Sequence, residues 1–152
     1  MQLVKQVKNP MSNQITHETT LAIIKPDAVQ SKHSGPIITM IELNKFTITA
    51  MQKVHLTRKQ AETFYAVHKE RSFFGELVDY MVSGPIIVMS LSKDNAVQEW
   101  RDLMGATNPA NAGPGTIRRM FGVDIGNNAV HGSDSLQNAA IEVKFFFGNG
   151  CC

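Results

Sequence analysis

The sequence predicts an α/β protein of the α+β type, with a ferredoxin-like split βαβ arrangement and a four-stranded antiparallel sheet covered by helices. Two observations favour this class. Four short strand-like runs alternate with stretches of helical periodicity, and their order is strand, helix, strand, helices, strand, helix, strand, helix. This order suggests helices on one face of the sheet. The 152 residues suit one domain, which we assign to residues 18–152, after a flexible extension at residues 1–17.

The first part of this domain is expected to hold a strand, a helix and a second strand. The apolar run at residues 20–24 is typical of a buried strand, and Pro26 ends it because proline cannot donate to a sheet ladder. A helix opens at Pro36, since proline suits the first helical position. Residues 46–54 alternate and are rich in β-branched side chains, which predicts the second strand.

Helices follow the second strand. Residues 57–60 match a capping box and begin one helix, and Ser72 is expected to cap another that ends before Pro85. Residues 86–91 predict a third strand. Apolar side chains at helical spacing around Trp100 predict the next helix.

The stretch from residue 105 to 128 is rich in glycine and proline and has little periodicity. A loop of this length inside a small domain is usually functional or disordered. A short strand at residues 129–131 follows it. A last helix comes next, which either Ser133 or Ser135 can cap.

Composition and charge exclude several classes of protein. The formal net charge is only +2, so no strong field attracts nucleic acid or an anionic membrane. No run approaches the ~18 apolar residues of a spanning helix. The two cysteines are adjacent, Cys151 and Cys152, so no disulfide framework or metal-binding spacing is present. We therefore expect a cytoplasmic protein with no membrane partner and no specific nucleic-acid partner.

His131 is the candidate nucleophile. A lone histidine is more often structural, but this one ends a strand beside Gly132, which lets the backbone approach a ligand, and Ser133, whose hydroxyl can donate. A neutral imidazole attacks phosphorus without a strong base, while an acceptor holds its second nitrogen. Glu142 in the last helix is a candidate for that acceptor, although a solvated helix residue is the alternative from spacing alone.

Cations flank the segment that contains His131. Phosphoryl transfer depends on positive charge and hydrogen-bond donors around the phosphates. Lys25 ends a buried strand, Arg101 ends a helix, and Arg118 lies in the long loop, where Thr107 is an extra donor. Each cation alone is compatible with a solvated surface charge. Together with His131 they favour a phosphate site.

Other chemistries lack their motifs. The sequence contains no G-x-x-x-x-G-K-[ST] loop, no protein-kinase motif set and no G-x-S-x-G elbow. Its five histidines show no metal-ligand spacing. A hydrolase built on the His-Gly-Ser segment would lack a defined triad.

From Thr19 to about Phe147 the chain closely resembles nucleoside diphosphate kinases of the bacterial type. The motifs that carry the resemblance are Ile24-Lys25-Pro26-Asp27, Ser83-Gly84-Pro85, Gly105-Ala106-Thr107-Asn108-Pro109-Ala110, Gly115-Thr116-Ile117-Arg118 and Asn128-x-x-His131-Gly132-Ser133-Asp134. The last motif is highly specific. Two departures stand out: Pro36 replaces a common Glu, and Met120 stands where the family usually has an acidic residue. The second bears on loop packing and subunit contacts.

The resemblance implies a role for each matched residue. It makes His131 the phosphorylated histidine and Glu142 the carboxylate that orients its ring. The catalytic set it implies is His131, Lys25, Glu142, Tyr65 and Ser133. The nucleotide-binding set it implies is Lys25 and Asn128 near the ribose 3′-hydroxyl, Arg101, Thr107 and Arg118 on the phosphates, Phe73, Leu77 and Ile125 around the base, and Gly132 beside the nucleophile. Without the resemblance, Phe73 would be assigned to core packing.

The resemblance also implies an activity: ping-pong transfer of the γ-phosphoryl group from a nucleoside triphosphate, typically ATP, to a nucleoside diphosphate. Mg²⁺ is expected as cofactor, held mainly by the nucleotide phosphates and not by a protein metal site. A homo-oligomer, tetramer or hexamer, is expected, and the cellular role is the balance of NTP and dNTP pools. Stacking on an aromatic ring would make the site indifferent to the base.

Two hypotheses from other classes stay open. One is a nucleotide- or nucleic-acid-binding protein that keeps the pocket without catalysis, against which His131, Lys25 and Glu142 argue. The other is a phosphohistidine carrier that serves a protein partner. Transfer of the phosphoryl group to a nucleoside diphosphate separates both from the enzyme.

Overall fold

The structure, a computed structural model, describes residues 17–148. Residues 1–16 of the expected extension, and Cys151 and Cys152, lie outside the described residues. The elements are β1 (His17–Ile24), α1 (Pro26–Gln30), α2 (Ser34–Leu43), β2 (Thr47–Val54), α3 (Arg58–Phe64), η1 (Ala66–His68), α4 (Phe74–Met81), β3 (Ile86–Asp94), α5 (Ala96–Met104), η2 (Pro109–Asn111), α6 (Ile117–Phe121), β4 (Val130–Gly132) and α7 (Leu136–Phe147).

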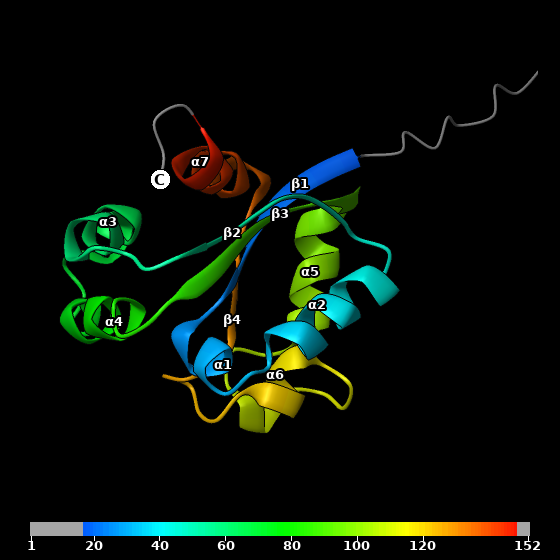
Figure 1. The fold of residues 1–152 in the computed structure, drawn as a ribbon, viewed down its shortest axis with the longest axis horizontal. Coiled ribbons are helices and arrows are strands. Elements are labelled where there is room, and N and C mark those ends of the chain that lie inside the picture. The colour runs from blue at the N-terminus through cyan, green and yellow to red at the C-terminus, as the bar shows by residue number, and fades with distance from the viewer. Residues whose placement is uncertain (1–16, 149–152) are drawn as a thin grey trace, which may run out of the picture.

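The four strands form one sheet in the order β2-β3-β1-β4, and every neighbouring pair is antiparallel (Figure 1). In the register, Leu21 of β1 lies opposite Ser90 of β3, and Ile23 lies opposite His131 of β4. With α2 between β1 and β2, and α5 between β3 and β4, the chain order is that of a split βαβ fold. The predicted ferredoxin-like class is therefore confirmed.

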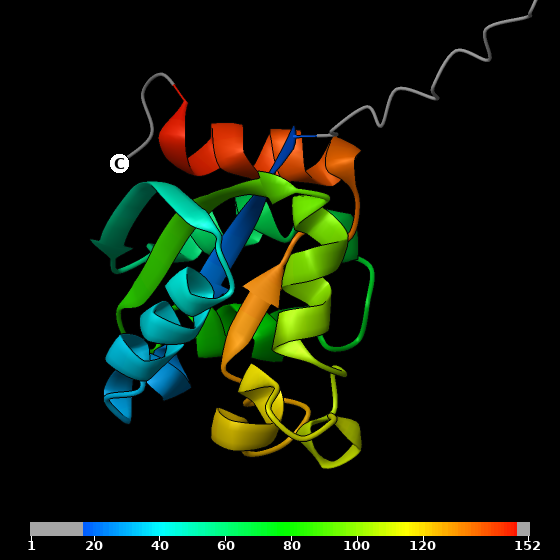
Figure 2. The ribbon, with the colours of Figure 1, turned by 90° about the vertical axis from the view of Figure 1, so that its right-hand side faces the viewer.

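Helices cover both faces of the sheet, so the prediction of helices on one face is wrong. Ala22 and Ile24 of β1 pack into a core with α2 and α5. Leu21 and Ile23 point to the other face, into a core with α3, α4 and α7. Figure 1 shows the two helix layers on opposite sides of the strands, and Figure 2 shows α2 and α5 in front of the sheet. Two-sided burial also explains why residues 20–24 are apolar without alternation.

Two helix starts follow the predicted chemistry, whereas α2 begins at Ser34, two residues before the expected Pro36, and α4 lacks its expected cap. Thr57 and Gln60 form the expected reciprocal capping box at α3. Ser135, one of the two candidates, caps α7 by accepting a hydrogen bond from the backbone N–H of Asn138. Ser72 was expected to cap α4, but the N-cap is Phe73 and it makes no side-chain cap bond. A short turned segment with its own backbone hydrogen bonds precedes α4 and replaces the side-chain cap.

Three short helical segments, α1, η2 and α6, were not predicted. Pro26 ends β1 as expected, but it is also the first residue of α1. The N–H at the first helical position has no partner within the helix, so proline loses no hydrogen bond there. The glycine-rich stretch from residue 105 to 128 contains η2 and α6, and Thr116 caps α6. Helices this short are too brief to show a periodic apolar pattern.

The end of β1 and the start of β4 lie side by side, because Ile24 pairs with Val130. Lys25 therefore leaves the sheet next to the point where Asn128 and Ala129 enter it. The backbone N–H of Lys25 donates to the carbonyl of Ala129 at 2.8 Å. Among residues 17–148, no helix has the length and apolar character needed to cross a bilayer.

Candidate active site

The His131 ring is held in place by its neighbours. Its Nε2 lies 2.5 Å from Oε1 of Glu142 on α7, and the edge-on ring of Phe64 lies 5.7 Å away between centroids. The indole N–H of Trp100 donates to the His131 carbonyl at 3.1 Å, which fixes the backbone. With its proton on Nε2, the ring donates to the carboxylate and keeps the Nδ1 lone pair free to attack an electrophile.

A polar pocket of about 220 Å³ lies at this end of the sheet. Five residues of the predicted site line it, namely Arg101, Thr107, Arg118, His131 and Gly132. They come from α5, the following loop, α6 and β4, which are far apart in the sequence. The fold therefore gathers two guanidinium groups, a hydroxyl and the candidate nucleophile around one cavity.

Arg118 is a buried cation that joins two segments of the pocket by hydrogen bonds. Its Nη1 donates to the carbonyl of Gly105 at 3.0 Å, and its Nη2 donates to the carbonyl of Val130 at 2.9 Å. Its Nε is buried and has no partner among the described residues. Burial, followed by the charge of Arg101, lowers the pKa of Arg118 to about 10, so it is still positive at neutral pH. A guanidinium has five N–H donors, so donors remain for a ligand.

Lys25 joins three segments. Its Nζ donates to Oδ1 of Asn128 at 2.9 Å, and the amide of Asn128 donates onward to the carbonyl of Thr107 at 3.1 Å. Burial and the nearby charge of Arg118 lower the pKa of Lys25 to about 8, and the carboxylate of Asp27 opposes that shift. The ammonium group is therefore cationic at neutral pH but loses its proton under mildly alkaline conditions.

Tyr65 lies at the end of α3, with its ring edge-on to Phe64 at 4.8 Å between centroids. Its hydroxyl is buried and has no partner among the described residues. Burial, and then the negative charge of Glu142, raise the pKa of Tyr65. The hydroxyl therefore keeps its proton and remains a donor next to the His131–Glu142 pair.

The other predicted residues lie around this centre in different ways. Ser133 is fully buried, and its Oγ accepts from the backbone N–H of Leu21 at 3.3 Å, so it extends the β1–β4 ladder. Phe73 is 46% exposed and Ile125 is 64% exposed, whereas Leu77 is half-buried. Exposed large apolar groups of this kind suit a surface that meets a planar ligand. Phe73 and Leu77 lie one helical turn apart, where the backbone N–H of Leu77 donates to the carbonyl of Phe73 at 2.9 Å.

Sequence reasoning missed the role of Asp27, although it quoted the motif that contains it. One carboxylate oxygen of Asp27 accepts from the backbone N–H of Ala129 at 3.1 Å, and the other accepts from the hydroxyl of Tyr80. Ala129 has a φ of 72°, a left-handed conformation that costs a non-glycine residue about 1–3 kcal/mol. Asp27 and Ala129 are 102 positions apart, so no local pattern signals this contact.

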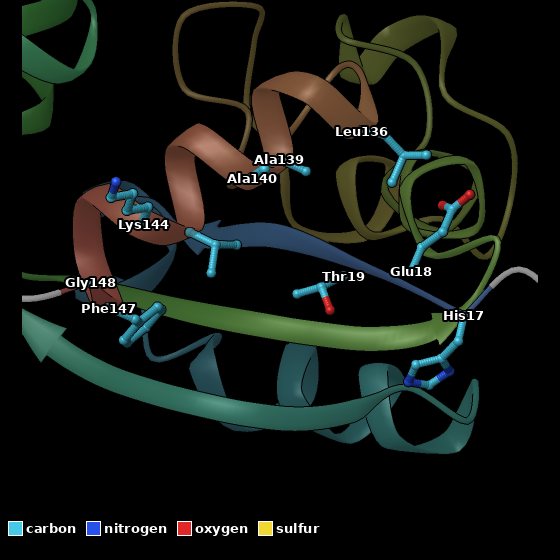
Figure 3. Close-up of a pocket in the computed structure, with 10 residues that line it drawn as sticks. His17, Glu18, Thr19, Leu136, Ala139, Ala140, Lys144, Phe147 and Gly148 are labelled. Carbon is cyan, nitrogen blue, oxygen red and sulfur yellow. The ribbon is translucent and has the colours of Figure 1, made fainter.

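Another hollow of the described surface lies elsewhere. Figure 3 shows it between the start of β1 and α7, with His17, Leu136 and Phe147 on its walls. Its volume is about 560 Å³, and Val143 also lines it. None of the residues that line it belongs to the predicted site. Its largely apolar walls lack the paired cations that phosphate recognition needs, so the smaller polar pocket is the candidate active site.

The charged groups of the polar pocket suit an anionic ligand. Arg101 and Arg118 line it, and Lys25 lies beside it through Asn128. Within the range 17–148 no group of three or more His, Cys, Asp or Glu side chains could hold a metal ion. The residues that line the pocket include two guanidinium groups and no carboxylate, so they suit phosphate oxygens and would leave a divalent cation to be held by those phosphates.

A histidine anchored through one ring nitrogen, opening onto a pocket with fixed cations, defines a site of the phosphotransferase class. Comparison with known proteins specifies the class. The family model described as nucleoside diphosphate kinase matches residues 18–150. Curated nucleoside diphosphate kinases of Chlamydia abortus and Chlamydia trachomatis serovar D are each 61% identical over 130 residues, which cover 86% of this chain and 92% of the relative.

Solved structures agree. The nucleoside diphosphate kinase of Aquifex aeolicus has a TM-score of 0.86 and 39% identity, over 88% of this chain and 97% of that one. The enzyme of Encephalitozoon cuniculi has a TM-score of 0.84 and 37% identity, over 89% and 92%. The chain belongs to the nucleoside diphosphate kinase family, whose members are phosphotransferases, so the resemblance stated from the sequence is confirmed.

Proposed function

We propose that this chain moves the γ-phosphoryl group from a nucleoside triphosphate, typically ATP, to a nucleoside diphosphate through a phosphohistidine on His131. The observation that carries the proposal is the 2.5 Å contact between Nε2 of His131 and Glu142, beside a pocket lined by Arg101 and Arg118. It leaves Nδ1 as the nucleophilic nitrogen. Family membership supports the same reaction.

The reaction has two matching halves. The Nδ1 lone pair forms a bond to the γ-phosphorus, and the bond from that phosphorus to the β-bridging oxygen breaks, so a diphosphate leaves with the electron pair. A terminal phosphate oxygen of a second diphosphate then attacks the phosphorus, and the N–P bond breaks. The ring gains positive charge in the first half, and the Glu142 carboxylate stabilises it across the Nε2–H hydrogen bond.

Other side chains bind and orient the nucleotide in this proposal. Arg101, Thr107 and Arg118 donate to the phosphates, since they line the pocket. Lys25 and Asn128, already bonded to each other, donate near the ribose 3′-hydroxyl and the leaving oxygen. Mg²⁺ held by the nucleotide phosphates would supply additional neutralisation of their charge, while Arg101 and Arg118 meet the rest from the protein side.

The remaining predicted residues complete the site. Tyr65 supplies a buried hydroxyl near the reacting phosphate. This hydroxyl can donate a hydrogen bond because its raised pKa keeps the proton in place. Ser133 and Gly132 act beside the nucleophile. Phe73, Leu77 and Ile125 contact the base, and stacking on Phe73 makes the site tolerant of different bases because every base has a π-face.

We also propose a homo-oligomer, tetramer or hexamer, that balances NTP and dNTP pools in the cytoplasm. β2 is an edge strand of the sheet, and Met51 on it and Leu43 on α2 are exposed. Exposed apolar side chains beside an edge strand favour association. Light scattering on the purified protein measures the subunit number, and a monomer at micromolar concentration would contradict the oligomer.

Incubation with γ-labelled ATP tests the proposed reaction. The protein should acquire acid-labile, base-stable label that an added nucleoside diphosphate removes. His131→Ala should abolish the label, whereas His55→Ala should keep it, because His55 lies at the end of β2 and bonds the Val82 carbonyl. Nucleotide binding without label would favour a pure binding protein. Label that passes to a protein but never to a diphosphate would favour a carrier.

A further inference from the structure

Asp27 makes contacts that the proposed reaction does not yet use. It follows Lys25 by two positions and lies in the first turn of α1. Its Oδ2 accepts from the backbone N–H of Ala129 at 3.1 Å, and its Oδ1 accepts from the hydroxyl of Tyr80 on α4. One carboxylate therefore connects α1, α4 and the segment that leads into β4.

Ala129 is the residue whose conformation this carboxylate holds. Its φ of 72° is one that residues with a side chain rarely adopt, and its side chain is fully buried. Asp27 holds its N–H, and the N–H of Lys25 donates to its carbonyl at 2.8 Å. Hydrogen bonds thus hold both peptide groups that flank the Ala129 Cα.

The neighbours of Ala129 in the sequence are site residues. Asn128 before it accepts from Nζ of Lys25, and the carbonyl of Val130 after it accepts from Arg118. His131 comes next on β4. A change in the backbone conformation at Ala129 would therefore displace Asn128, the partner of Lys25, relative to His131, the nucleophile.

We propose that Asp27 is a positioning residue for phosphoryl transfer: anchored by Tyr80, its carboxylate holds Ala129 in a left-handed conformation and so fixes Asn128 and His131 relative to Lys25. The inference rests on the proposed function of His131. It assigns Asp27 no contact with the nucleotide. Asp27 acts on the positions of Asn128 and His131 and on the protonation of Lys25.

Charge supports the placement. Four groups face the Lys25 ammonium: Asp27 from α1, Tyr80 from α4 with its ring centroid 6.0 Å away, Arg118 from α6, and Asn128. Asp27 opposes the lowering of the Lys25 pKa by burial and by Arg118. Burial and Asp27 raise the pKa of Tyr80, so its hydroxyl remains the donor. Removal of the carboxylate charge should therefore lower the Lys25 pKa below about 8.

The test compares Asp27→Asn with Asp94→Asn. Asp94 is a carboxylate on the same sheet, but it pairs with His17 at the opposite end of β1. Single-turnover phosphorylation from γ-labelled ATP should slow about 10- to 100-fold in Asp27→Asn, as expected for a misplacement of about 1 Å. The KM for nucleotide should rise less than kcat falls. The alkaline limb of the pH–rate profile should move to lower pH, which a purely structural role would not cause. Asp94→Asn should match the wild type in all three.

Two further variants separate position from charge. Ala129→Gly makes a positive φ inexpensive, so when added to Asp27→Asn it should recover part of the rate but leave the alkaline limb displaced. Tyr80→Phe keeps the carboxylate charge and removes its anchor, so it should slow phosphorylation without moving the limb to lower pH. Should Asp27→Asn fail to fold by circular dichroism, Tyr80→Phe decides the matter, and a wild-type rate in it would overturn the inference.

Failure of the inference differs from failure of the proposed function. A wild-type protein that never acquires label on His131 would overturn both. A labelled wild type together with a folded Asp27→Asn variant that has the same rate and the same alkaline limb would overturn the role of Asp27 alone.

Discussion

Replacement of Glu142 by glutamine removes the charge beside His131 and keeps the shape of the side chain. The contact is 2.5 Å long, and the two side chains are only 22% and 17% exposed. In the phosphorylated state the ring is close to a full positive charge, so the bond is charge-assisted. Such bonds contribute about 1.5–3 kcal/mol, which corresponds to a rate about 10- to 150-fold lower.

Quench-flow measurement of His131 labelling from γ-labelled ATP gives this rate directly. The nucleotide KM should change little in Glu142→Gln, since Glu142 does not line the phosphate pocket. Glu99→Gln is the matched control, because Glu99 forms an ion pair with Lys93 at 3.3 Å and is 45% exposed. A labelling rate in Glu142→Gln equal to that of Glu99→Gln would refute the reasoning that the carboxylate stabilises the charged ring.

Three other predictions concern charge, packing and stacking. The phosphorylation rate should fall as pH rises through about 8, because the protonated Lys25 is the active form and its pKa is about 8. A pH–rate profile measures this fall, and Lys25→Arg should abolish it. Gly132→Ala would place a Cβ 2.5 Å from Cδ1 of Trp100. Urea denaturation should therefore show a loss of about 1–3 kcal/mol in the free energy of unfolding. The control Gly75→Ala, whose Cβ would meet nothing within 4 Å, should show no such loss. Phe73→Ala should raise the nucleotide KM about 10-fold through lost stacking, with an unchanged Tm because the ring is 46% exposed; an unchanged KM would remove Phe73 from the base site.

The regular part of the fold could be predicted because its signals are local. The unbroken apolar run of residues 20–24 marks β1, and the Thr57–Gln60 box marks the start of α3. The five-residue helices α1 and α6 escaped prediction because each is barely longer than one turn. The order of the strands depends on packing between distant segments, which no local pattern encodes. Coverage of both faces did leave a local signal, the run without alternation in β1, which the prediction of helices on one face did not use.

The candidate site likewise has a part that local sequence indicated and a part that depends on contacts between distant residues. Residue type and flanking glycine indicated His131 from its own neighbourhood in the sequence. The contacts that organise the pocket join distant positions: Lys25 and Asn128 are 103 apart, and Asp27 and Ala129 are 102 apart. Family resemblance supplied the first pair, since it assigned both residues to the ribose. It gave no role to Asp27, whose partner is a backbone N–H that any residue at position 129 except proline would offer.

Phosphorus NMR of the protein after reaction with ATP and Mg²⁺ tests the central claim most directly, because it distinguishes the two ring nitrogens of a phosphohistidine. The account predicts one phosphoramidate signal, on Nδ1 of His131, that disappears when a nucleoside diphosphate is added and is absent in His131→Ala. A signal on Nε2, the nitrogen that Glu142 holds, or a phosphate ester on a serine, would contradict it.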